Sequence, residues 1–114
     1  MEVEFIKARL KKGLEDKRSL QKKYGKECAK KIQVRILSLI AAENLHVFDL
    51  PKSKSKSKPE RCHELIGKRA GEFALDLSHP FRLIFKPNNQ LESFTDWRLI
   101  DSITILKVED YHGK

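Results

Sequence analysis

The four histidines are the side chains of this sequence best suited to proton transfer near neutral pH, because an unperturbed imidazole titrates in that range. His63 lies in a basic segment and His112 lies close to the last residue, each in polar company beside a predicted strand. His46 and His79 fall at a helix exit and in a turn, and we expect both to be surface residues. The first pair is therefore the candidate for chemistry.

Two imidazoles on either side of an RNA phosphodiester can catalyse its cleavage. One removes the proton of the 2′-hydroxyl, the other protonates the departing 5′-oxygen, and a nearby cation stabilises the phosphorane charge. Arg82, which strand alternation places on the free face of a predicted sheet, is a suitable cation. Two histidines so far apart in the sequence do not define a site by themselves. Whether they form one site depends on the strands and loops that position them.

The residues just before His112 have more than one reading. Asp110 could be a base, a carboxylate that orients a histidine, or an ordinary residue at a strand end. Tyr111 could stack on a nucleobase, donate a hydrogen bond or pack at the edge of the core.

We expect no metal and no cofactor. Cys62 and His63 are adjacent, and Cys28 falls in a predicted helix, so no C-x-x-C or H-x-x-x-H pair is present to build a zinc site. The sequence contains neither a glycine-rich phosphate loop nor a nucleophile elbow.

The elements that would position these residues follow from hydrophobic periodicity. Short alternation predicts a strand at 3–6, and helical spacing predicts helices over 16–24 and 26–42, separated by Gly25. Alternation returns at 72–77 and 81–86 with a turn between them, which predicts an antiparallel hairpin, and 101–110 is the last strand. The chain is thus a single α+β domain over 1–114, with the order β-α-α-β-β-β.

The two faces of the sheet can be assigned from the same alternation. Six large apolar side chains of the hairpin face the helices, and Arg82 points the opposite way; the six are Phe73, Leu75, Leu77, Phe81, Leu83 and Phe85. In the last strand, Ile103 and Ile105 lie on one face and Leu106 and Val108 on the other, which favours an interior position. In the longer helix, Ala29, Ile32, Ile36, Leu39 and Ile40 form an apolar stripe, and we expect Lys26, Lys30 and Arg35 to lie in water.

The net charge of +8 is concentrated in the first half of the chain. Residues 1–61 contain 17 Lys and Arg against 8 Asp and Glu, whereas residues 62–114 contain 7 against 8. Such a balance favours a polyanion or an acidic protein as partner. The Lys/Ser segment within 51–59 predicts a flexible loop, whose lysines either contact phosphates or simply keep the loop solvated.

The remaining composition indicates a cytoplasmic protein. No apolar run approaches the roughly 20 residues that span a bilayer, and residues 1–4 show no signal-peptide pattern. The two cysteines do not make a disulfide framework.

Three segments together resemble the RelE/ParE toxin superfamily, and within it the HigB-like, "plasmid maintenance killer" branch. They are Arg61-Cys62-His63-Glu64-Leu65-Ile66-Gly67-Lys68-Arg69-Ala70-Gly71, Phe81-Arg82-Leu83-Ile84-Phe85 and Glu109-Asp110-Tyr111-His112. The resemblance is specific over about 59–87 and 101–113, and residues 1–50 are compatible with it. It implies two N-terminal helices packed on one face of a small, mainly antiparallel sheet. The Lys/Ser insertion and the long loop at 88–99 depart from the pattern.

The resemblance also implies a function. The expected protein is the toxin of a bacterial type II toxin–antitoxin module, a ribosome-dependent endoribonuclease that cleaves mRNA in the A site. Its expected partners are the ribosome, mRNA and a small helix-turn-helix antitoxin, through which alone it would reach operator DNA. By position, His63, Arg82, Asp110, Tyr111 and His112 match the catalytic set. The expected RNA-binding residues are Lys54, Lys56, Arg61, Lys68 and Arg69.

Two other classes of function remain open, because a fold does not decide a function. The same domain could bind without cleaving, as a ParE-like inhibitor of DNA gyrase. It could also be an inactive relative that acts only through its antitoxin on operator DNA, which the basic first half permits. The polar Asp110-Tyr111-His112 tail favours the enzyme, since a binding module has no chemical need of it.

Overall fold

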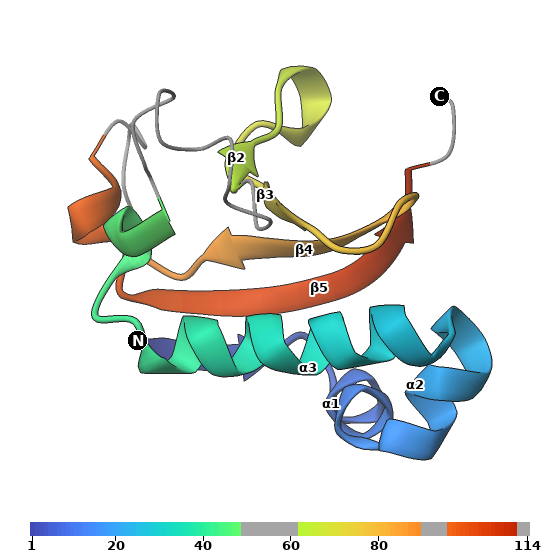
Figure 1. The fold of residues 1–114 in the computed structure, drawn as a ribbon. Helices are drawn as coiled ribbons and strands as arrows, with labels where there is room; N and C mark the ends of the chain where they lie inside the picture. Colours follow the sequence, from blue (N-terminus) through green and yellow to red (C-terminus); the bar gives the residue numbers. More distant parts are fainter. Residues whose placement is uncertain (49–61, 90–95, 112–114) are drawn as a thin grey trace.

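A five-stranded sheet with three helices on one of its faces forms the framework of the protein (Figure 1). The computed structural model describes residues 1–48, 62–89 and 96–111. The predicted loop at 51–59 lies outside these residues. No helix within them is both long enough and apolar enough to cross a membrane.

The strands follow the order β1-β5-β4-β3-β2 across the sheet. They are β1 (Glu2–Phe5), β2 (His63–Glu64), β3 (Phe73–Asp76), β4 (Phe81–Pro87) and β5 (Ser102–Asp110). β1 pairs with β5 in parallel, and the other neighbours are antiparallel. The sheet is therefore mixed, and β5 has the interior position that its apolar faces predicted.

Three helices, rather than the two predicted, precede the hairpin: α1 (Ala8–Glu15), α2 (Lys17–Tyr24) and α3 (Lys26–Ala41). Asp16 separates the first two, because its carboxylate accepts hydrogen bonds from the backbone N–H groups of Arg18 and Ser19 at the start of α2. Gly25, at φ +89°, separates α2 from α3. Gly13 lies within α1.

The order β-α-α-β-β-β is consequently wrong in detail, although the α+β class is confirmed. The second omission is β2, whose two residues are too few to show alternation. Short 3₁₀ helices occupy the connections: η1 (Leu45–Phe48), η3 (Gly67–Arg69) and η4 (Trp97–Leu99).

The main core lies between the sheet and the helices. Five of the six predicted hairpin side chains belong to it, and Phe81 packs against it. Phe73 stacks on Phe85 with ring centroids 5.7 Å apart and meets the edge of Trp97. From α3, Ile32 and Leu39 are fully buried beneath these strands.

Two residues of α3 differ from the prediction. Arg35, expected in water, is only 5% exposed, and its Nε donates a hydrogen bond of 3.4 Å to the backbone carbonyl of Asp76 at the end of β3. Ile40, expected in the core, is 50% exposed. The buried face of the helix is centred on Cys28, Ile32, Arg35 and Leu39, so the stripe is rotated from the one we predicted.

A bulge in β5 changes which side chains face the helices. Ile84 pairs with Lys107 and Phe85 with Ile105, which leaves Leu106 as the extra residue. Leu106 packs in a small second cluster on the opposite face of the sheet, while Val108 joins the main core. The expectation that these two side chains share a face is wrong, because one extra residue reverses the alternation beyond it.

Candidate functional site

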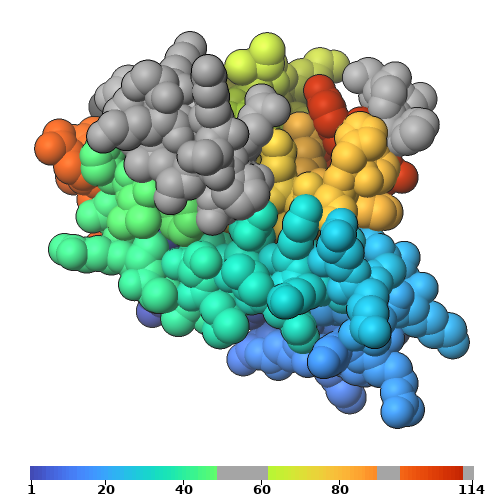
Figure 2. Space-filling view, in the orientation of Figure 1, coloured from blue at the N-terminus to red at the C-terminus, as the bar shows by residue number. Residues whose placement is uncertain are grey.

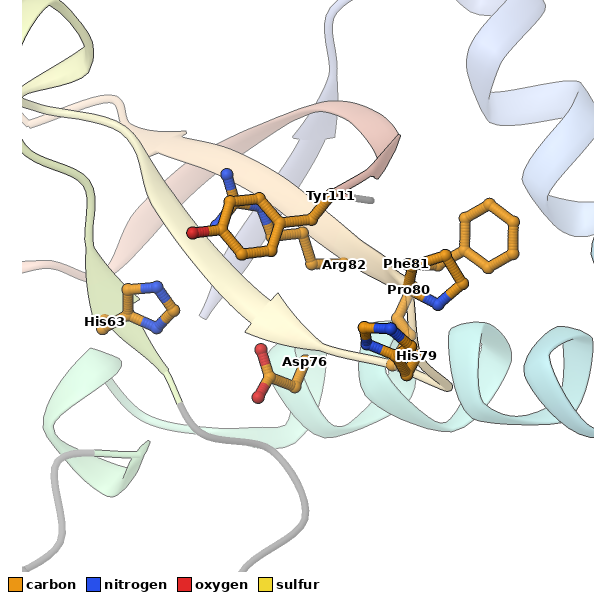
Figure 3. A pocket seen from close by; sticks show the side chains of 8 residues that line it. His63, Asp76, His79, Pro80, Phe81, Arg82 and Tyr111 are labelled. Carbon is orange, nitrogen blue, oxygen red and sulfur yellow. The ribbon is translucent and has the colours of Figure 1, made fainter. Parts of the chain in front are cut away.

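A pocket of about 310 Å³ opens on the sheet face that carries Arg82, close to the β3–β4 turn (Figure 3). Residues from three separate segments line it, so the fold brings them together rather than the local sequence. They are His63, Asp76, Leu77, His79, Pro80, Phe81, Arg82 and Tyr111. Three residues of the predicted set, His63, Arg82 and Tyr111, meet here.

Arg82 lies on β4 and is only 8% exposed. Its Nε and Nη2 both donate to Oε2 of Glu109, at 3.0 and 2.7 Å. Tyr111 covers the guanidinium, whose central carbon lies 3.8 Å from the ring centroid, the geometry of a cation–π contact. The cation is therefore held on one edge and on one face before any substrate arrives.

Glu109 is a site residue that the sequence reasoning did not identify. Its carboxylate also accepts from Arg69, and Lys107 Nζ lies 3.4 Å from it. The hydrogen bond from Arg69, supported by Arg82, lowers the pKa of Glu109 to about 2 even though burial opposes the shift. Strict alternation would have turned Glu109 toward the helices, and the bulge at Leu106 turns it to this face.

His63 reaches the pocket from β2, opposite Ala74 of β3. Two hydrogen bonds join this strand and the residue after it to the residues just before β3. Leu65 N donates to the carbonyl of Glu72 at 2.8 Å, and Gly71 N donates to the Glu64 carboxylate at 3.1 Å. The imidazole is exposed, which suits a group that must exchange protons with a bound substrate.

Two further pocket residues, Asp76 and His79, were not among the predicted site residues. His79 is exposed, as we expected, but it lies in the turn beside the pocket opening, and Asp76 lies between the two imidazoles in the view of Figure 3. Asp76 pairs with Arg82 across β3 and β4. This register was available from the sequence, since alternation already placed Asp76 and Ala74 on the same face.

The end of β5 delivers Tyr111 to the pocket. Tyr111 N donates to the carbonyl of Pro80 at 2.8 Å, which joins the strand end to the β3–β4 turn. Asp110 is exposed and pairs in register with Phe81; it is not one of the described residues that line the pocket. His112 lies outside the described residues.

The predicted RNA-binding residues separate into two groups. Lys68 is exposed on η3, and Arg69 beside it is half-buried and engaged by Glu72 and Glu109, which raises its pKa. Lys54, Lys56 and Arg61 lie outside the described residues. The ammonium of Lys68 is thus available to a polyanion. Arg69 already belongs to an ion cluster, which consists of Arg69, Glu72, Arg82, Lys107 and Glu109.

The donor set of the pocket is suited to proton transfer and anion binding. Among the described residues, no group of three or more His, Cys, Asp or Glu side chains is arranged to hold a metal ion. Two imidazoles, a carboxylate, a phenol and a held guanidinium can bind a phosphodiester and move protons on either side of it. No protein-family model, curated protein or solved structure matches the chain.

Proposed function

We propose that the protein is the toxin of a type II toxin–antitoxin module, a RelE/ParE-like endoribonuclease of the HigB-like branch that cleaves mRNA on the ribosome. The observation that carries the proposal is the pocket in which His63, Arg82 and Tyr111 meet from three distant segments. The net charge of +8 supports a polyanionic substrate.

The proposed reaction is internal attack on a phosphodiester. The 2′-oxygen forms a bond to phosphorus while its proton passes to a basic group, and the bond from phosphorus to the 5′-oxygen breaks as an acidic group protonates that oxygen. The products are a 2′,3′-cyclic phosphate and a 5′-hydroxyl, so atoms and charge balance. His63 is one proton-transfer group, and His112 is the second that the resemblance implies.

Arg82 would stabilise the charge that develops on the phosphorane. Glu109 takes the edge of the guanidinium that carries Nε, and Nη1 makes no hydrogen bond with the described residues. Nη1 and the second hydrogen of Nη2 form an edge that fits two phosphate oxygens. A held donor is most effective because it needs no reorganisation as the charge appears.

The proposed partner is a small antitoxin. The exposed surface of α3, which crosses the middle of the molecule in Figure 2, includes an apolar stripe that offers it a place to dock. Val34, Leu37 and Ile40 are 43%, 64% and 50% exposed there. Lysines on the preceding turns of α3 would favour acidic groups beside the apolar contact.

The test is to add the purified protein to an mRNA with and without translating ribosomes and to map new 5′ ends. We expect cuts that need ribosomes and that His112→Ala reduces by on the order of 10², the usual scale for an acid or base group. Cuts on naked RNA would keep the nuclease and remove the ribosome requirement. Without cuts in either reaction the nuclease proposal is wrong, and a supercoiling assay with DNA gyrase then tests the ParE-like alternative.

A further inference from the structure

We infer that His79 is a catalytic residue of this pocket, a proton-transfer group opposite His63 that acts in addition to the His112 of the proposed function, and that Asp76 is the carboxylate that positions the pair. The inference rests on the proposed nuclease function and adds two residues that the family resemblance does not supply. It starts from the pocket lining, where the two imidazoles come from different segments and Asp76 lies between them in Figure 3.

The position of His79 is well determined by the backbone around it. The turn is closed by hydrogen bonds from Leu77 N to the carbonyl of Phe81 at 3.1 Å and from Phe81 N to the carbonyl of Ser78 at 2.8 Å. Tyr111 N adds a third bond to the carbonyl of Pro80. These hydrogen bonds hold the backbone of the turn, and with it the exposed imidazole of His79, beside the pocket.

Asp76 is held from behind the sheet. The buried Arg35 donates from Nε to the Asp76 carbonyl, and this is the one hydrogen bond that the Arg35 side chain makes with the described residues. Arg35 is only 5% exposed, and removing a guanidinium from water costs folding free energy. Its burial here therefore calls for a role beyond packing. It holds the end of β3, and with it the half-buried carboxylate of Asp76, at the pocket.

The chemistry needs two groups of opposite protonation state on either side of the scissile phosphate. With His63 at β2 and His79 at the turn, a phosphodiester held by Arg82 in the same pocket has an imidazole available toward each end. Asp76 lies in the same lining, and a carboxylate there can accept a hydrogen bond from an imidazole N–H and fix the orientation of the ring. One imidazole takes the 2′-hydroxyl proton and the other gives its proton to the leaving oxygen, so the protons balance.

Other charged groups also act on this pair, and the test must separate them. Arg82 and Tyr111 line the same pocket. Further groups lie on the elements packed around it: Arg35 on α3, Cys28 and Lys31 near the turn, and Glu109 and Asp110 on β5. None of these is altered by the substitutions below, so a change in the pH profile reports on His79 and Asp76.

The experiment measures single-turnover cleavage of ribosome-bound mRNA from about pH 5 to about pH 9. The variants are His79→Ala, Asp76→Asn and His112→Ala, with His46→Ala as the control because His46 is also exposed and lies on η1, outside the pocket lining. We expect His79→Ala to lower the rate by on the order of 10², to remove one limb of the pH profile, and to regain rate with added imidazole. Asp76→Asn should lower the rate without removing a limb, which distinguishes a positioning carboxylate from a proton-transfer group.

The outcomes are distinguishable. If the unmodified protein cleaves and His79→Ala and Asp76→Asn keep its rate and its pH profile, the inference is overturned and the proposed function stands. If His112→Ala alone removes a limb, the second group is His112 and the inference is again overturned. If the unmodified protein cleaves nothing, both proposals fall. Thermal unfolding of each variant shows whether a loss of rate comes from the pocket or from the fold.

Discussion

Glu109 meets Arg82 at the side-on edge of the guanidinium, with Nε and Nη2 both donating to one carboxylate oxygen. This contact orients the cation, and it leaves Nη1 without a hydrogen bond to the described residues. The ammonium of a lysine does not have the planar fork of donors that a guanidinium has, so lysine cannot replace arginine at this position. The guanidinium of Arg82, held in this way by Glu109, is the main electrostatic feature of the site.

Arg82→Lys should therefore impair cleavage while leaving the net charge unchanged. We expect the rate to fall by on the order of 10², comparable to the loss of one transition-state donor. Single-turnover rates on ribosome-bound mRNA measure this. Arg98→Lys is the matched control, because Arg98 pairs with Asp96 at the surface and does not line the pocket. Equal rates for Arg82→Lys and the unmodified protein would contradict the assigned role.

Glu109 links the ion cluster to stability in acid. Its pKa is lowered from 4.5 to about 2, so the carboxylate stabilises the folded state above its unfolded pKa, and this contribution is lost as the pH falls through about 2. The free energy of unfolding in urea, measured from neutral pH downward, should decrease as the pH falls from the unfolded pKa of 4.5 to about 2. In Glu109→Gln the decrease should be smaller. Asp96→Asn, which removes an exposed ion pair, should leave the slope nearly unchanged.

The ring of Tyr111 and its hydroxyl can be tested separately. The ring covers Arg82, and Tyr111→Phe preserves that contact. We expect Tyr111→Phe to retain cleavage within a few-fold, whereas Tyr111→Ala should lose on the order of 10-fold, since a cation–π contact is worth about 1 kcal/mol. A large loss in Tyr111→Phe would show that the hydroxyl itself takes part in the reaction.

The apolar stripe on α3 gives a prediction about the antitoxin. Leu37→Asp should weaken co-purification with the antitoxin by at least 10-fold, because one buried leucine contributes about 2 kcal/mol to an interface. Cleavage by the isolated toxin should stay unchanged, since Leu37 does not line the pocket. Leu99→Asp, with similar exposure on η4, is the control. Loss of cleavage in Leu37→Asp would contradict a separate docking surface.

Periodicity predicted the parts of the fold that repeat regularly. The hairpin, the core face of its strands and the interior position of the last strand all follow from apolar residues at a period of two. It missed the division at Asp16, where a side chain caps a helix within a polar stretch. It also misplaced Arg35 and Ile40, because both lie at the margin of the stripe where tertiary packing decides which is covered.

The candidate site was predicted in its residue types more than in its contacts. His63, Arg82 and Tyr111 were identified by type and position, and the pocket brings them together. Glu109 was missed because a bulge cannot be read from alternation, and the alternation before Leu106 pointed it elsewhere. His79 was missed because a turn residue shows no periodic pattern, whereas Asp76 was overlooked although alternation had already placed it on the same face as Ala74.

The extra residue in β5 also decides which changes of strand length the site can survive. Removing Leu106 would let Lys107 follow Ile105 directly, so Lys107, Val108 and Glu109 would keep their pairings opposite Ile84, Leu83 and Arg82. Straightening β5 with all of its residues kept would instead turn Glu109 toward the apolar layer under the sheet, and Arg82 would keep its charge without its carboxylate. A chain shortened by this one residue would therefore keep the contact between Glu109 and Arg82, whereas a chain of full length depends on the bulge for it.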